Sequence, residues 1–67
     1  MVLHSALTPR ERQVLDLVQH GMTNREIGAL LGISPATVHQ HMLMVLTRLN
    51  LRNRTEAAVW AERHGVW

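Results

Sequence analysis

The sequence predicts an all-α fold built from four short helices. Apolar residues recur every three or four positions along most of the chain, which is the period of a helix with one buried side. Residues that favour helix N-caps stand just before these stretches, and glycine stands just after three of them. Because caps, stops and apolar period agree with one another, no other fold class fits the chain as well.

The first helix is predicted to begin after Thr8 and to end at Gly21. Thr8 is a good N-cap, Pro9 follows at the first helical position, and Glu11 completes a capping box with the cap residue. Leu7, which precedes the cap, is expected to pack inward. The apolar face of this helix consists of Val14, Leu15, Leu17 and Val18.

The second helix has the same signals in a shorter stretch. Thr23 is its predicted cap, Glu26 completes a second capping box, and Gly32 ends it. Its predicted apolar side consists of Ile27, Leu30 and Leu31. Only Gly32 and Ile33 separate this helix from the cap of the next, and so short a link forces two helices to cross steeply. Residues 23–42 are therefore expected to form a helix-turn-helix.

The third helix, expected over residues 35–49, has two distinct sides. Ser34 is its N-cap, with Pro35 at the first helical position. One stripe, predicted to be buried, consists of Val38, Met42, Val45 and Leu49. A separate arc consists of Ala36, His39, Gln40, Leu43 and Thr47. This second arc carries hydrogen-bonding and apolar groups but no acid, which suits an element that enters a nucleic-acid groove.

The fourth helix is expected to begin after Asn53, with Glu56 forming a third capping box, and to end at Gly65. Residues at helical spacing along it are Ala57, Trp60, Ala61 and His64. The stripe formed by the small residues and Trp60 can pack in the core of the monomer, and it can equally allow a second copy of the chain to approach closely. We expect the stripe to serve both purposes, with Trp60 partly buried in the monomer.

Composition places limits on what this chain does. Its 67 residues make one domain at most, and the absence of cysteine excludes disulfides and Cys-ligated zinc. No apolar run approaches the ~20 residues of a membrane span, and no signal peptide opens the chain. Every basic residue is arginine, which grips phosphate well, although codon bias explains this equally and a net charge of +2 is weak evidence for nucleic acid.

Several motifs stand in an order without gaps. They are Leu7-Thr8-Pro9-Arg10-Glu11, Gly21-x-Thr23-Asn24-Arg25-Glu26-Ile27, Leu31-Gly32-Ile33-Ser34, Thr37-Val38-x-x-His41, Val45, Arg48-Leu49 and Arg52-Asn53-Arg54-Thr55-Glu56-Ala57. In these residues the chain resembles the LuxR-type helix-turn-helix domain, and its tail is most similar to the nitrate-response branch of response regulators. The domain is expected over residues 7–67, after a disordered start or linker stub at residues 1–6.

The resemblance implies a tri-helical core plus a C-terminal dimerisation helix, and sequence-specific DNA binding by a dimer on two half-sites. The third helix would lie in the major groove. Candidate base readers are His39, Gln40, Leu43 and Thr47. Candidate phosphate contacts are Thr23, Asn24, Arg25, Ser34, Thr37, His41, Arg48 and Arg54. At least one of these arginines is expected to pair instead with Glu11 or Glu26. Candidate dimer contacts are Ala57, Trp60, Ala61 and His64.

The third helix departs from the family pattern in its charge. His39 stands where lysine is common, Leu43 and Met44 stand where basic or polar residues are common, and Arg48 is the only fixed positive charge there. Gln40 can pair with adenine and Leu43 can touch a thymine methyl, so we expect a preference for A·T base pairs. The alternative is a protein-interaction or heterodimerising module with weak or no DNA binding, docking through Leu43 and Met44.

The expected partners are double-stranded DNA, a second copy of the chain through the fourth helix, and RNA polymerase. No enzyme activity, cofactor or small-molecule ligand is expected, because no nucleophile–base pair or phosphate loop is visible. His39 and His41 are two residues apart, a spacing that points them to different sides of a helix and argues against a metal site. We expect a bacterial regulator in the cytoplasm, with this chain either part of a longer protein or a stand-alone member.

Overall fold

A computed structural model describes residues 6–67 of the chain, and these residues form four helices and no strand. The helices are α1 (Pro9–Gln19), α2 (Asn24–Leu31), α3 (Pro35–Leu49) and α4 (Arg54–His64). The predicted all-α, four-helix architecture is confirmed. Residues 1–5, most of the predicted disordered start or linker stub, lie outside the described residues.

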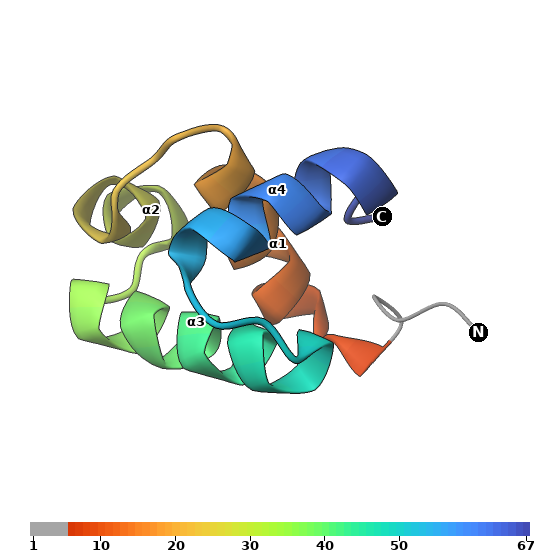
Figure 1. Ribbon diagram of the computed structural model, residues 1–67. Helices are drawn as coiled ribbons and strands as arrows, with labels where there is room; N and C mark the ends of the chain where they lie inside the picture. Colours follow the sequence, from red (N-terminus) through yellow and green to blue (C-terminus); the bar gives the residue numbers. More distant parts are fainter. Residues whose placement is uncertain (1–5) are drawn as a thin grey trace.

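Helix α1 lies at the centre of the molecule, with α3 along one side of it and α4 along another (Figure 1). Helix α2 packs mainly against α3. The core is aliphatic, and its largest fully buried side chains are Leu15, Ile27, Val14, Val38 and Val45. Leu7 is buried as expected, and Val66, just beyond α4, closes the same cluster. The core therefore holds three helices around α1 and leaves one side of α3 outside.

Two of the three predicted capping boxes form in full. In each, a threonine hydroxyl accepts a hydrogen bond from the backbone amide of a glutamate, whose carboxylate accepts one from the threonine amide. The third box forms only in part. The Asn53 side chain accepts from the Glu56 amide at 2.9 Å, but the Glu56 carboxylate turns to Arg52. The carboxylate accepts from the Arg52 backbone amide at 2.7 Å and from the Arg52 Nε at 2.9 Å. The second bond is charge-assisted, and such bonds are stronger than those between neutral groups.

The link between α2 and α3 is as tight as the sequence predicts. Gly32 adopts the left-handed conformation at φ 73° and ends α2, and the axes of α2 and α3 are bent by 106°. Gly28 lets the two helices approach closely, because a Cβ there would lie 2.5 Å from the carbonyl oxygen of Ile33. The turn therefore depends on two glycines, one for its backbone conformation and one for its lack of a side chain.

The predicted apolar side of α2 was wrong at Leu30. This side chain is 63% exposed, whereas Ile27 and Gly28 are the buried residues of α2 and Leu31 is partly buried. The close contact at Gly28 turns α2 so that Leu30 lies at the outer edge of its apolar arc. Within residues 6–67 no single helix is long and apolar enough to cross a membrane, although α2 and α3 together pass on length and composition despite their bend.

Candidate nucleic-acid interface

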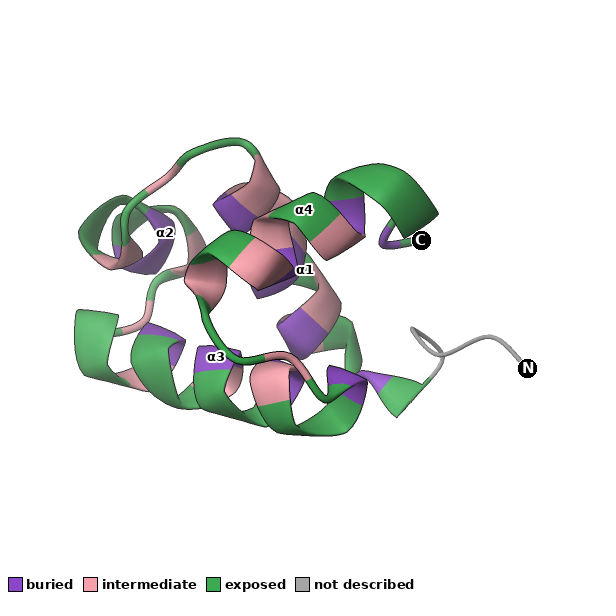
Figure 2. Ribbon diagram, in the orientation of Figure 1, coloured by how far each residue is buried: buried purple, intermediate pink, exposed green. Residues whose placement is uncertain are grey.

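Helix α3 has a buried side and an exposed side, as its sequence predicts. The buried residues are Val38, Met42, Val45 and Leu49. The exposed residues run along the side that faces away from the other helices (Figure 2), and they include Ala36, His39, Gln40, Leu43, Met44 and Thr47. The whole helix contains no acid. Its outer side therefore offers a long strip of hydrogen-bonding and apolar groups without a charge that repels phosphate.

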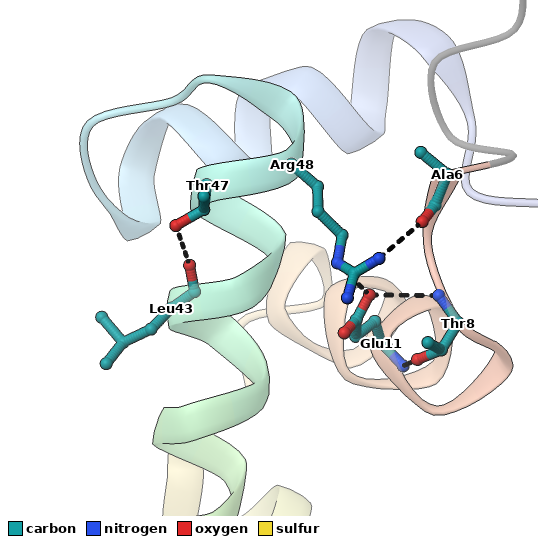
Figure 3. A network of polar contacts seen from close by, with 6 residues as sticks. All are labelled: Ala6, Thr8, Glu11, Leu43, Thr47 and Arg48. Carbon is teal, nitrogen blue, oxygen red and sulfur yellow. Dashed lines mark hydrogen bonds and ion pairs between the residues drawn. The ribbon is translucent and has the colours of Figure 1, made fainter.

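Thr47 has a limited capacity to read a base. Its hydroxyl donates to the carbonyl oxygen of Leu43 at 2.9 Å, one turn earlier in the helix (Figure 3). This common bond of helical threonine occupies the only proton of the hydroxyl. Thr47 can still accept a hydrogen bond or offer its methyl group, whereas Gln40 keeps both an amide donor and an acceptor on the same face.

The N-terminal end of α3 carries the Ser34 cap and Thr37. The Ser34 Oγ accepts from the Thr37 amide at 3.1 Å and lies 2.9 Å from the Thr37 Oγ1. One of these two hydroxyls must donate to the other, so one proton remains for an outside acceptor. This remaining donor lies at the positive end of the helix dipole, where an anion such as phosphate is stabilised.

The N-terminal end of α2 brings together three further phosphate candidates, Thr23, Asn24 and Arg25. The Glu26 carboxylate accepts a hydrogen bond from the Thr23 backbone amide. This bond is the main cause of the lowered pKa of the Glu26 carboxyl group, and the hydrogen bond with the Thr23 side chain is the second cause. Arg25 is exposed, and its guanidinium has no hydrogen bond or ion pair within the described part of the chain. Among the three arginine candidates, Arg25 is therefore the one whose charge is available to a ligand.

Arg54 is committed to the fold in this structure. Its Nη1 donates to the side-chain oxygen of Asn24, and its Nη2 donates to the carbonyl oxygen of Met22 at 2.6 Å. These bonds tie the start of α4 to the first residue of α2 and to the segment before it. They also occupy the Asn24 acceptor, so Asn24 and Arg54 hold this corner of the molecule together.

Arg48 is likewise engaged within the domain (Figure 3). Its Nε lies 3.3 Å from the Oε1 of Glu11, and its Nη1 donates to the carbonyl oxygen of Ala6 at 3.2 Å. Glu11 is only 4% exposed, and the same Oε1 accepts from the Thr8 amide at 3.1 Å. At least one arginine was expected to pair with Glu11 or Glu26, and Arg48 is that residue. The one fixed positive charge of α3 is therefore already paired.

Two of the candidate dimer contacts of α4, Ala57 and Ala61, lie in the core of the monomer. These residues are almost fully buried in the monomer core, because their small side chains let α4 lie close against α1. Trp60 is half-buried and stacks on His64, with ring centroids 4.7 Å apart. An open groove lies beside them and is lined by Leu51, Thr55, Glu56, Val59, Trp60, Arg63 and His64.

Sequence reasoning missed Leu51, Thr55 and Val59 as part of this outer face. The signal that could have found them is the position of Val59, two residues from Ala57 and hence on the opposite side of the helix. Over residues 6–67, no three His, Cys, Asp or Glu side chains are grouped so that they could hold a metal ion.

Residues 5–61 match the family of bacterial regulatory proteins named luxR. This chain belongs to the luxR family. It is 44% identical to the transcriptional regulatory protein LiaR of Bacillus subtilis (strain 168), over 91% of this chain and 29% of that protein. It is 39% identical to the nitrate/nitrite response regulator protein NarL of Escherichia coli (strain K12), over 91% of this chain and 28% of NarL.

A third luxR-family relative, the transcriptional regulatory protein UhpA of Salmonella typhimurium (strain LT2), is 48% identical over 78% of this chain and 26% of UhpA. The chain thus spans less than a third of the length of the curated relatives it matches. The resemblance seen in the sequence is confirmed. The chain is a DNA-binding helix-turn-helix domain of this family of transcription regulators.

Proposed function

We propose that this chain is the output domain of a bacterial transcriptional regulator and binds specific double-stranded DNA with α3 in the major groove. The observation that carries the proposal is the exposed, acid-free side of α3, which presents His39, Gln40 and Leu43 opposite the buried stripe. A B-DNA major groove admits an α-helix, and base edges are read there by side chains of these kinds. The domain acts without cofactor, and its partners are DNA, a second copy and RNA polymerase.

Affinity in this proposal comes first from phosphate contacts. The groups that stay available are Arg25, the remaining hydroxyl proton of the Ser34–Thr37 pair, and the partly buried His41. Such contacts release counterions, so the logarithm of the binding constant falls linearly with the logarithm of salt concentration. Because Arg48 and Arg54 are already engaged, we expect a shallower salt dependence than all three arginines together would produce.

Sequence preference comes from the middle of the exposed side of α3. Gln40 lies opposite the core and can make two hydrogen bonds to adenine, while Leu43 can contact a thymine methyl group. His39 lies at the flank of the same side, within reach of a base or a phosphate. Thr47 contributes an acceptor or its methyl group, since its proton is used within the helix. The preferred half-site should therefore contain A·T base pairs under α3.

Two copies would dimerise through the outer face of α4 and so place two recognition helices on half-sites about one helical turn apart. The open groove beside Val59, Trp60 and His64 supports this arrangement, because it offers apolar surface and a half-buried tryptophan. A two-fold interface is formed by the same patch on both subunits, so this groove would meet its own copy.

Selection of binding sites from random DNA, followed by gel-shift measurements at several salt concentrations, tests the proposal. We expect selected sites with A·T pairs and an affinity that falls as the salt concentration rises. Gln40→Ala should weaken binding to the selected site by about tenfold or more, since a bidentate contact contributes ~1–3 kcal/mol. Gln13→Ala is the matched control, because Gln13 is an exposed glutamine on α1. An affinity indifferent to salt would contradict the phosphate contacts.

A protein-interaction module of the same fold is the second candidate. It is favoured by two observations: α3 has a single fixed cation, which is paired with Glu11, and the apolar Leu43 and Met44 are exposed. This candidate predicts no gel shift even at low salt, where electrostatic binding is strongest. It also predicts that the selection experiment returns no common sequence.

A further inference from the structure

We propose that Met44 is a specificity-determining residue of this domain, and that Met44 and Leu43 hold thymine methyl groups on the two sides of the base pair read by Gln40. Met44 is not among the base readers that the sequence suggests, and it replaces a polar type of residue. The inference rests on the proposed function, because it assumes that α3 lies in the major groove. It specifies the chemical groups that this surface recognises, namely two thymine methyl groups.

The position of Met44 on α3 is the first support. Met44 is 43% exposed and Leu43 is 48% exposed, and both follow Gln40 by one turn of the helix. At 3.6 residues per turn, Leu43 lies about 60° to one side of Gln40 and Met44 about 40° to the other. The four buried residues lie on the opposite side of the helix. Met44 is therefore closer to the outward direction than His39, which lies about 100° from Gln40.

The chemistry of this patch is the second support. The two side chains one turn after Gln40 are apolar, and the only fixed cation of α3 is held by Glu11 and Ala6. A base edge that meets this patch can contribute an apolar group, and in the major groove only thymine carries one, its C5-methyl. Methionine is flexible and polarizable, so it can follow the surface of a methyl group whose position varies slightly with DNA shape.

The size of the patch distinguishes this occupant from a protein. Patches that dock proteins usually cover several hundred Å², whereas Leu43 and Met44 are two half-exposed side chains flanked by His39 and Gln40. The patch is also continuous with the strip that faces DNA in the proposed function. A contact of two side chains with two methyl groups fits the area that is present.

The spacing predicts where the methyl groups lie. A step of three or four residues advances ~4.5–6 Å along a helix, and successive base pairs are ~3.4 Å apart. The methyl groups should therefore lie within about two base pairs of the adenine that Gln40 reads. Because Leu43 and Met44 diverge to opposite sides of Gln40, they should reach thymines on opposite strands.

Replacement of single thymines by deoxyuridine in the selected half-site tests this inference. The replacement removes one methyl group and leaves every hydrogen bond of the base pair in place. We expect two such positions, one on each strand, where the affinity of the wild-type chain falls about fourfold. This figure is the ~0.8 kcal/mol of one buried methyl-sized group, converted at 1.4 kcal/mol per tenfold.

Variants then assign each methyl group to a side chain. Met44→Ala should lose sensitivity to deoxyuridine at one position and keep it at the other, and Leu43→Ala should show the reverse pattern. Leu30→Ala is the matched control, because Leu30 is an exposed leucine on α2, and it should keep both sensitivities. Circular dichroism and urea unfolding should show all three variants folded, since none of the changed side chains belongs to the buried core.

The outcomes separate this inference from the proposed function. Absence of any binding, with the chain folded, would overturn the proposed function and this inference with it. Tight, salt-dependent binding that no deoxyuridine replacement weakens would overturn only the role of the methyl groups. If Met44→Ala lowered affinity equally for thymine and deoxyuridine sites, the side chain would act elsewhere, and Met44 would not be the residue that reads the methyl.

Discussion

At the scale of single residues, the most consequential finding is that Arg48 belongs to the fold. It joins the last turn of α3 to the nearly buried Glu11 of α1 and to the backbone at Ala6. A carboxylate this deeply buried needs partners, because an unpaired charge in a low dielectric is costly. Arg48 therefore fixes the far end of the proposed DNA-reading helix, whether or not it also approaches phosphate.

Arg48→Ala should destabilise the domain by about 1–2 kcal/mol, measured by urea unfolding. The expected cost is below that of a fully buried pair because the Arg48 side chain is 36% exposed. Arg25→Ala is the control and should change stability by less than about 0.5 kcal/mol, since Arg25 is exposed and unpaired within residues 6–67.

A double-mutant cycle identifies the partner. Replacing Glu11 by Gln and Arg48 by Ala together should cost less than the sum of the two single changes, because both remove the same ion pair. Strictly additive costs would mean that the 3.3 Å contact contributes nothing to stability.

At the scale of elements, the crossing of α2 and α3 depends on Gly28. The sequence marks Gly32 as the end of α2, but nothing in it marks Gly28 as a contact. In the structure, α2 places Gly28 against the carbonyl of Ile33. The same contact turns α2 so that Leu30 faces outward, which explains the error in its predicted apolar side.

Gly28→Ala should destabilise the domain by about 2 kcal/mol, although alanine is the better helix former by ~1 kcal/mol. The added Cβ would lie 2.5 Å from a backbone oxygen, which cannot move aside as a flexible side chain could. Gly21→Ala is the comparison, because that position has a positive φ of 82° but no atom within 4 Å of an added Cβ. Thermal unfolding of both variants tests whether the close contact at Gly28 makes its replacement the more costly one. A Gly28→Ala variant as stable as the wild type would refute the prediction.

Two glutamates in the first turns of α2 and α4 make the stability of the domain depend on pH in the acid range. The pKa of Glu26 is lowered by the Thr23 amide and hydroxyl, and that of Glu56 is lowered by hydrogen bonds from the Arg52 side chain and amide. Groups whose pKa falls on folding stabilise the folded state fully above their unfolded value of 4.5, and this contribution is lost as pH falls through the lower, folded values.

Urea unfolding midpoints should therefore stay level from neutral pH down to about 5 and decline below 4.5. Glu26→Gln and Glu56→Gln should each reduce this decline. Glu62→Gln should leave it unchanged, because Glu62 is exposed and has no hydrogen bond or ion pair in the part of the chain that the structure describes. A decline that neither variant reduced would show that these two carboxylates are not its source.

At the scale of the whole molecule, burial of Ala57 and Ala61 moves the proposed dimer surface to the opposite side of α4. Val59 is 40% exposed and lies in the open groove, so it is the residue at which the surface can be tested without disturbing the core. Val59→Arg should leave the fold intact and weaken self-association at least tenfold, because the two-fold axis brings two like charges together.

Sedimentation equilibrium with and without a two-half-site DNA measures this effect. Leu30→Arg, an equally drastic change at an exposed leucine of α2, is the control and should leave self-association unaltered. A Val59→Arg variant that still formed dimers would show that another surface joins the two copies.

Much of the fold follows from local signals in the sequence. Thr8, Thr23 and Ser34 cap their helices as predicted, and the stripe from Val38 to Leu49 is buried as predicted. These features depend on residues within one or two turns of each other, so a single sequence contains them in full. The exposed positions of His39, Gln40 and Leu43 follow from the same periodicity.

The sequence by itself thus determined the four helices, their caps and the outward side of α3. Only the tertiary structure decided which arginines are held by hydrogen bonds within the domain. Arg48 bonds Ala6 and Arg54 bonds Asn24, across sequence separations of 42 and 30 residues. It also decided that Ala57 and Ala61 are buried in the core of the monomer. Helical period fixes which residues share a face, but only the packing of helices distant in sequence selects what each face touches.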